Sequence, residues 1–143
     1  MSVARLTFYL AFLIAFAFAL AACKKSRPTK TVSFTLSTTE GNQGPKPFAN
    51  EEVAIFPVEG ENIRVGDNNR LGMGKTDANG HATVEFHSPT QYTEYVLLSR
   101  TNNVYMMLRT HEGKALTFKC DNATCDMGDV VFEVFELSFK SGS

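Results

Sequence analysis

The chain has 143 residues, enough for one domain of ordinary size, and a formal net charge of −1. The charge is unevenly distributed, because the part after residue 30 holds nine basic residues and all 15 acidic ones, a net charge of −6. A domain this acidic lacks the basic surface that nucleic acids require, so we expect no nucleic-acid partner.

The N-terminus has the three parts of a secretory signal. Arg5 supplies one positive charge, an uncharged apolar run of 17 residues follows over 6–22, and small side chains end the run. A membrane-spanning helix needs about 20 apolar residues. A permanent N-terminal anchor is therefore the alternative to a cleaved signal.

The motif Leu20–Cys23 (Leu-Ala-Ala-Cys) closes that run and resembles a bacterial lipobox. The resemblance implies that diacylglycerol is attached to the Cys23 thiol, that residues 1–22 are cleaved off, and that the new amine receives a fatty acid such as palmitate. Because two or more acyl chains hold a protein stably on a bilayer, we expect membrane lipid as a partner. Lys24 stands where inner-membrane lipoproteins tend to have Asp, which favours the outer membrane.

Residues 23–30 are predicted to be a basic tether between the lipid and the folded part. The segment holds four basic residues and one proline: Lys24, Lys25, Arg27, Lys30 and Pro28. Basic residues near a membrane are attracted to anionic head groups by about 1 kcal/mol each, but a plain solvated spacer has the same composition. Both interpretations stay open.

Residues 31–143 are predicted to form one all-β domain. Short alternating or apolar runs are separated by Gly, Asn, Asp and Pro, and no segment has the period of a helix. Seven or eight strands in this length favour an antiparallel β-sandwich after a cleaved N-terminal signal peptide. The predicted strands are 31–37, 53–58, 71–76, 81–87, 95–99, 104–109, 115–120 and 130–139.

The last strand has a change of phase. Its apolar positions shift from one face to the other near Val134 and Phe135. Such a shift predicts a β-bulge, or a strand that bends from one sheet to another.

The residues before 81–87 form a predicted turn. The Asp77 carboxylate can cap it, and Gly80 can take the left-handed conformation without steric cost. A calcium loop is the alternative, but the carboxylates lack the spacing of such a loop. No metal site is predicted.

Three stretches resemble the transthyretin-like and carboxypeptidase-regulatory-like domains. Residues 47–56 are similar to a Pro-containing loop that leads into a "V-x-V" strand, residues 75–86 to a "T-D-x-x-G" hairpin, and residues 125–131 to a "G-D-I" start of a terminal strand. The resemblance spans roughly residues 32–137 and implies an immunoglobulin-like sandwich of antiparallel strands.

Cys120 and Cys125 are predicted to form a disulfide. They are the two cysteines left once Cys23 is lipidated, and disulfides persist in exported proteins. A metal site would need further ligands nearby. Closing so short a loop stabilises the fold by roughly 2 kcal/mol in the chain-entropy model.

No catalytic residue and no cofactor is predicted, so we expect that the chain is not an enzyme. The transthyretin family includes the hydroxyisourate hydrolases, which end in Tyr-Arg-Gly-Ser, whereas this chain ends in Lys-Ser-Gly-Ser. His81, His87 and His111 lack the spacing of metal ligands and are interpreted as exposed histidines at strand ends.

The predicted function is a non-enzymatic binding or structural module in the cell envelope, with an envelope protein as partner. Tyr105, Met106 and Met107 are the candidate contacts, because Tyr and Met suit adaptable interfaces and sandwich edges accept further strands. An ordinary core strand is nevertheless the favoured interpretation of this stretch. The second candidate function is a carbohydrate- or small-ligand-binding accessory domain, although the chain has no Trp.

Overall fold

The computed structural model describes residues 27–140, and their side chains as far as residue 133. The predicted signal peptide 1–22 and Cys23 lie outside the described residues. The described part contains ten strands and one short 3-10 helix. These elements are β1 Thr29–Thr38, β2 Lys46–Pro47, β3 Glu52–Glu59, β4 Asn62–Ile63, η1 Asp67–Asn69, β5 Gly72–Lys75, β6 His81–His87, β7 Glu94–Thr101, β8 Val104–Arg109, β9 Thr117–Lys119 and β10 Thr124–Lys140.

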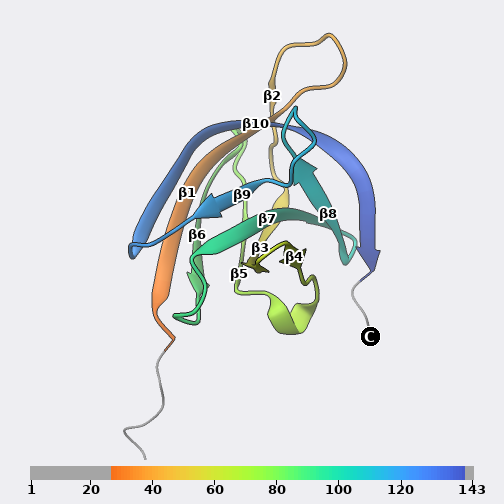
Figure 1. Cartoon of the computed structure of the whole chain (residues 1–143). Coiled ribbons are helices and arrows are strands. Elements are labelled where there is room, and N and C mark those ends of the chain that lie inside the picture. Colours follow the sequence, from red (N-terminus) through yellow and green to blue (C-terminus); the bar gives the residue numbers. More distant parts are fainter. Residues whose placement is uncertain (1–26, 141–143) are drawn as a thin grey trace, which may run out of the picture.

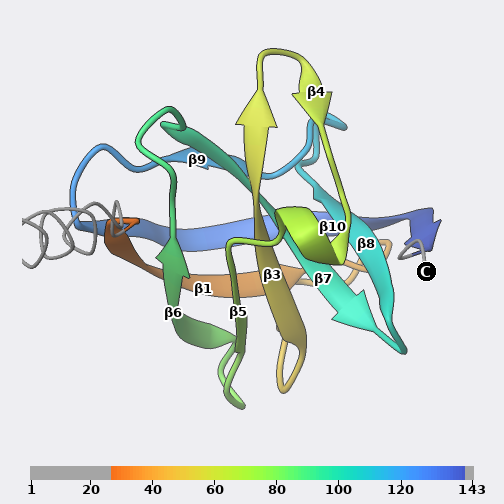
Figure 2. The ribbon, with the colours of Figure 1, turned by 90° about the horizontal axis from the view of Figure 1, so that it is seen from below.

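The strands form a closed barrel, so the predicted sandwich is wrong. Seven strands follow one another in the order β3-β5-β6-β1-β10-β8-β7, and β7 pairs in turn with β3. Figures 1 and 2 show these strands wrapped around one interior. The all-β class is confirmed. The pair β1–β10 is parallel, which also departs from the antiparallel expectation.

Strand β10 is what closes the barrel. It is the long blue arc in Figure 1, and it pairs with β1 through residues 124–132 and with β8 through residues 133–140. Its register against β8 shifts between Val134 and Ser138, which confirms the predicted irregularity. A second shift, beside Gly128 at φ 65°, adds one residue to β10 opposite β1. Bulges increase local twist and bend, so both help one strand to join two partners.

The barrel interior is filled by alternate residues of its strands. In β6, Ala82, Val84 and Phe86 are buried and the residues between them are exposed. Period-2 alternation therefore identified the core face correctly. The interior holds Val32, Phe34, Leu36, Val53, Ile55, Ala82, Val84, Phe86, Tyr95, Leu97, Leu108, Leu116, Phe118, Cys120 and Phe132.

A second, smaller core lies outside the barrel. β3 and β7 are buried on both faces, and their outward side chains pack with those of β8. The buried members of this outer core are Ala54, Phe56, Val96, Leu98, Tyr105 and Met107. Ile63 and Val65 of the segment 60–71 cover them. Two apolar residues in a mostly polar segment are too weak a sequence signal to predict a second core.

Candidate functional site

The predicted partner-binding stretch lies inside the fold. β8 pairs with β7 on one side and with β10 on the other, so it is not an edge strand. Tyr105 is 0% exposed and Met107 6%, while Met106 is partly buried. The expectation of an accessible binding edge here is wrong, because barrel closure turns a sandwich edge into a central strand.

The three histidines are exposed and have separate partners. His81 Nδ1 lies 3.4 Å from the Thr35 hydroxyl, and His87 Nδ1 lies 3.1 Å from that of Thr29. His111 Nδ1 lies 2.8 Å from Glu133 Oε1, and this hydrogen bond raises the pKa of the imidazole. Each histidine thus pairs with a different neighbour.

The Asp77–Gly80 turn uses its carboxylate for the backbone. Asp77 Oδ1 accepts hydrogen bonds from the amides of Asn79 (2.8 Å) and His81 (2.9 Å), and these bonds lower the pKa of Asp77. Gly80 has φ 79°, and a Cβ there would stand 2.2 Å from Leu36 O. The turn interpretation is confirmed. Within the described residues, no group of three or more His, Cys, Asp and Glu side chains could hold a metal ion.

The predicted disulfide between Cys120 and Cys125 is present, with Cα atoms 5.7 Å apart. It joins the end of β9 to the start of β10. The hairpin 120–125 lies against the start of β1, where the Thr31 amide donates to Ala123 O at 2.8 Å. The disulfide therefore holds the hairpin at the end of the barrel where the predicted tether enters.

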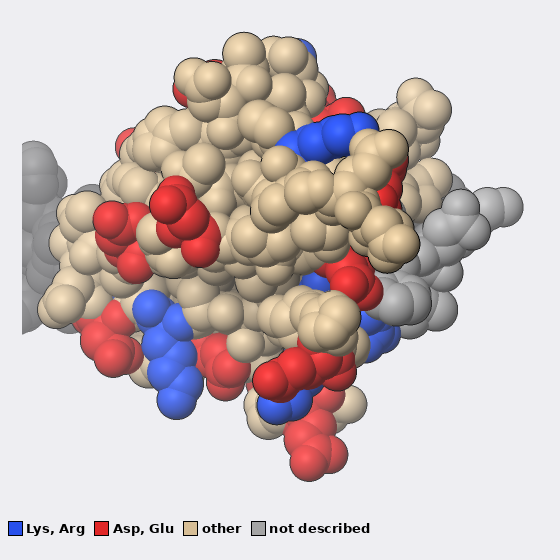
Figure 3. Space-filling model, turned by 90° about the horizontal axis from the view of Figure 1, so that it is seen from above, with Lys and Arg blue, Asp and Glu red and all other residues tan. Residues whose placement is uncertain are grey.

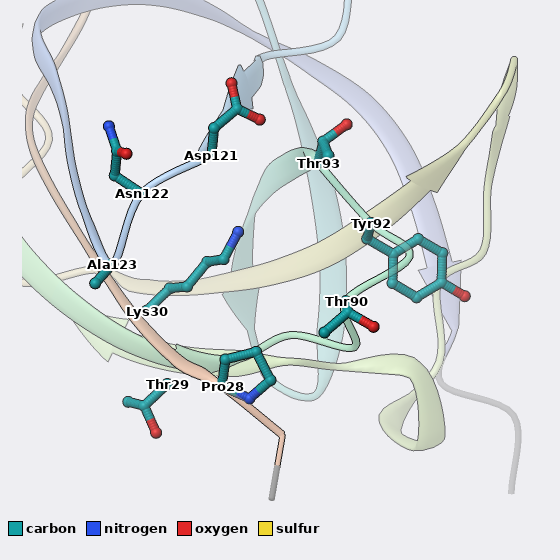
Figure 4. Close-up of a pocket in the computed structure, with 9 residues that line it drawn as sticks. All are labelled: Pro28, Thr29, Lys30, Thr90, Tyr92, Thr93, Asp121, Asn122 and Ala123. Carbon is teal, nitrogen blue, oxygen red and sulfur yellow. The ribbon is translucent and has the colours of Figure 1, made fainter. Parts of the chain in front are cut away.

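A cleft of about 330 Å³ opens at that end, and we call it the tether-end cleft (Figure 4). Three segments distant in sequence form its wall: the start of β1, the loop 89–93 and the disulfide hairpin. The lining residues are Pro28, Thr29, Lys30, Thr90, Tyr92, Thr93, Asp121, Asn122 and Ala123. A second hollow, of about 470 Å³, is lined by the single stretch 110–117.

Beside the tether-end cleft lies a polar network around a buried tyrosine. Tyr95 is 0% exposed, and its hydroxyl donates to Tyr92 O at 2.8 Å. The same oxygen lies 2.6 Å from Oγ of the fully buried Ser88 and 3.4 Å from the ammonium of Lys30. Buried polar groups need such partners, and the network fixes Lys30 in the wall of the cleft.

Lys30 is held by neutral oxygens. Its ammonium donates to the Cys120 carbonyl and to the Tyr95 hydroxyl, and it lies 5.6 Å from the centre of the Tyr95 ring. No carboxylate of the described residues forms an ion pair with it. In the sequence, Lys30 is the last residue of the predicted basic tether 23–30. Local composition carried no signal for its role in the cleft, because its partners Tyr95 and Cys120 lie far away in the sequence.

One face of the surface shows mixed charge. On the face seen from above in Figure 3, acidic and basic side chains lie beside one another, and this part of the described surface shows no basic patch. No helix among the described residues is long and apolar enough to cross a membrane.

No protein-family model and no curated protein matches the sequence. Among solved structures, a 9R-lipoxygenase from Cyanothece is similar with 16% identity and a TM-score of 0.48, over 76% of this chain and 17% of the enzyme. A proposed carbohydrate-binding protein from Pseudomonas aeruginosa matches with 13% identity and a TM-score of 0.43, over 79% of this chain and 93% of that protein.

A minor pilin from Streptococcus agalactiae is also similar, with 14% identity and a TM-score of 0.40, over 81% of this chain and 48% of the pilin. The chain spans about a sixth of the lipoxygenase and about half of the pilin. All three TM-scores are below 0.5, so these likenesses assign the chain to no family.

Proposed function

We propose that the chain is an exported lipoprotein that acts as a non-enzymatic binding module beside a membrane, with the tether-end cleft as its binding site. The observation that supports this proposal most directly is the position at which the predicted tether enters the fold. The segment 23–30 runs from the predicted lipid-bearing Cys23 into β1, and its last residue, Lys30, lines the cleft. A lipid at Cys23 would place this cleft close to the anchoring membrane.

Two features support the proposal. The Cys120–Cys125 disulfide is the kind of bond that persists in exported proteins. The cleft draws hydroxyl, amide and charged groups from three segments onto one concave surface, as small-ligand sites do. Because Tyr105 and Met107 are buried in the outer core, we do not propose a protein partner at β8. We propose instead that a small ligand binds in the tether-end cleft. Lys24 after the lipidated cysteine favours the outer membrane.

The anchoring is tested by Cys23→Ser in the full chain, expressed in a bacterium that processes lipoproteins. We expect the variant to lose its acyl chains by mass spectrometry and to leave the membrane fraction. The double variant Cys120→Ser/Cys125→Ser is the matched control, because it also replaces cysteine but keeps the lipobox, and it should remain acylated. Acyl chains on the Cys23→Ser protein would refute the assignment.

A further inference from the structure

The tether-end cleft holds a cation without a carboxylate partner. The Lys30 ammonium donates to two neutral oxygens and has a third N–H, while its charge is compensated by no described acidic side chain. In Figure 4 the ammonium points into the space between the disulfide hairpin and the loop 89–93. Thr90 and Thr93 of the loop 89–93 line the same cleft. A cation on a concave polar surface attracts an oxyanion.

The donor set favours phosphate over carboxylate. Arginine has a planar fork that matches the two oxygens of a carboxylate, whereas lysine is a compact point charge with three donors. The cleft contains Lys30 and no arginine. An ammonium with three donors does not impose the planar, two-pronged geometry that suits a carboxylate, so it accepts a tetrahedral group.

Asp121 restricts the class of ligand further. Its side chain is exposed on the disulfide hairpin at the rim of the cleft, and it forms no ion pair or hydrogen bond with the described residues. A bare phosphate would be repelled by this carboxylate, but a phosphate that carries its own ammonium group would be attracted at both ends. The cleft thus offers one cation and one anion to the ligand.

We propose that the tether-end cleft binds a phosphoethanolamine group, with its phosphate at Lys30 and its ammonium at Asp121. The inference deepens the proposed binding function and rests on it. Lys30 lies seven positions after Cys23, a reach of at most about 25 Å, so a head group of the anchoring membrane is one source of this chemistry. A soluble phosphoethanolamine compound is the other source.

Binding is measured by calorimetry and by amide chemical shifts on the exported chain, purified from whichever fraction it occupies. The probes are phosphoethanolamine, inorganic phosphate and ethanolamine. We expect phosphoethanolamine to bind tightest and Lys30→Gln to weaken it by about tenfold or more, since a charge-assisted hydrogen bond is lost. Asp121→Asn should abolish the preference over inorganic phosphate. Lys119→Gln, an exposed lysine outside the cleft, is the matched control and should bind normally.

Vesicle binding by the non-acylated Cys23→Ser protein distinguishes the two sources of the ligand. Co-sedimentation with phosphatidylethanolamine vesicles but not phosphatidylglycerol vesicles, abolished by Lys30→Gln, identifies a lipid head group. Binding of the soluble compound without co-sedimentation identifies a soluble ligand. Equal binding by Lys30→Gln and the unchanged protein, or no binding of phosphoethanolamine, overturns the inference.

Asp121→Asn keeps the inference testable if Lys30→Gln fails to fold, because Asp121 makes no contact that the fold needs. Loss of anchoring would leave the soluble titration unaffected. Failure of the proposed lipidation and failure of this inference therefore give different results.

Discussion

Two buried tyrosines, one in each core, are held in different ways. Tyr95 fills the barrel interior, and its hydroxyl bonds to a buried serine, a backbone carbonyl and one lysine. Tyr105 fills the outer core, and its hydroxyl donates to Asp67 at 2.6 Å and accepts from Arg70 at 2.8 Å. Both rings are 0% exposed, but Asp67 and Arg70 have side chains 52% and 29% exposed.

The two hydroxyl networks belong to different regions: one lies in the barrel core and the other lies on the segment that covers the outer core. The interior network consists mainly of neutral groups, and its members Tyr95 and Ser88 are fully buried, so only its Lys30 side reaches the cleft and water has little access to a lost partner. The outer network is an ion pair of Asp67 and Arg70, 3.1 Å apart, on the segment that covers β3, β7 and β8. Water reaches those groups. We therefore expect an equivalent substitution to lower the free energy of unfolding more in the barrel interior than under the covering segment.

The largest effects should come from removing one aromatic ring from each core. Phe86 packs edge-on against Tyr95 and Phe118 inside the barrel, and Phe56 packs edge-on against Tyr105 outside. We expect Phe86→Ala to lower the free energy of unfolding by about 4–5 kcal/mol and Phe56→Ala by about 3 kcal/mol, because the segment 60–71 can settle into the gap. Denaturant unfolding measures both, and a larger loss for Phe56→Ala would contradict the comparison.

Removal of the disulfide should act at one end of the barrel. We expect Cys120→Ser/Cys125→Ser to cost about 2 kcal/mol by the loop-closure argument. Amide exchange should speed up at Thr31, which bonds to Ala123 O, and stay nearly constant at Leu98, which lies between β3 and β8. Exchange that accelerates equally at both amides would show that the two regions open together.

Removing only the hydroxyl groups tests the networks themselves. Tyr95→Phe takes a donor and an acceptor from an enclosed network, and we expect a loss of about 1–2 kcal/mol. Tyr105→Phe leaves Asp67 and Arg70 paired with each other and with water, and we expect about 0.5–1 kcal/mol. Equilibrium unfolding of the two variants side by side gives the difference, and equal losses would remove the distinction.

The smallest effect should appear only in alkaline solution. Burial and the hydrogen bond to Asp67 raise the pKa of Tyr105 above its ordinary value of 10.0. The folded protein then keeps a proton that the unfolded chain releases, so this contribution to stability is complete below pH 10 and is lost as the pH rises toward the folded-state pKa. The stability gap between the unchanged protein and Tyr105→Phe should shrink above pH 10. A stability gap that widens above pH 10 would show that folding lowers the pKa of Tyr105 instead of raising it.

Local residue patterns predicted much of the strand layout. β6 and β8 have the predicted bounds, and β1, β3 and β7 extend the predicted runs by one or two residues at each end. Asn102 and Asn103 turn the chain between β7 and β8, and both have the positive φ that asparagine tolerates. These features are local, since alternation and turn residues act over a few positions.

The candidate site could be predicted only in fragments. The disulfide was predicted from cysteine count and expected export, and the residues that it encloses, 121–123, form one wall of the cleft. Lys30 carried no such signal, because its bond to the Cys120 carbonyl spans 90 residues of sequence. Ser88, which follows the exposed end of β6, gave no hint that it would be fully buried beside Tyr95.

The sequence by itself determined which residues of most strands face a core, where the Asp77–Gly80 turn lies, and that Cys120 pairs with Cys125. Tertiary structure decided that the strands close into a barrel, that Tyr105 and Met107 are covered, and that Lys30 meets the loop 89–93 and the hairpin 120–125. Alternation reports one buried face, which a sandwich and a barrel share. Closure depends on the pairs β1–β10 and β3–β7, whose partners lie far apart in the chain, and no local pattern records such a pairing.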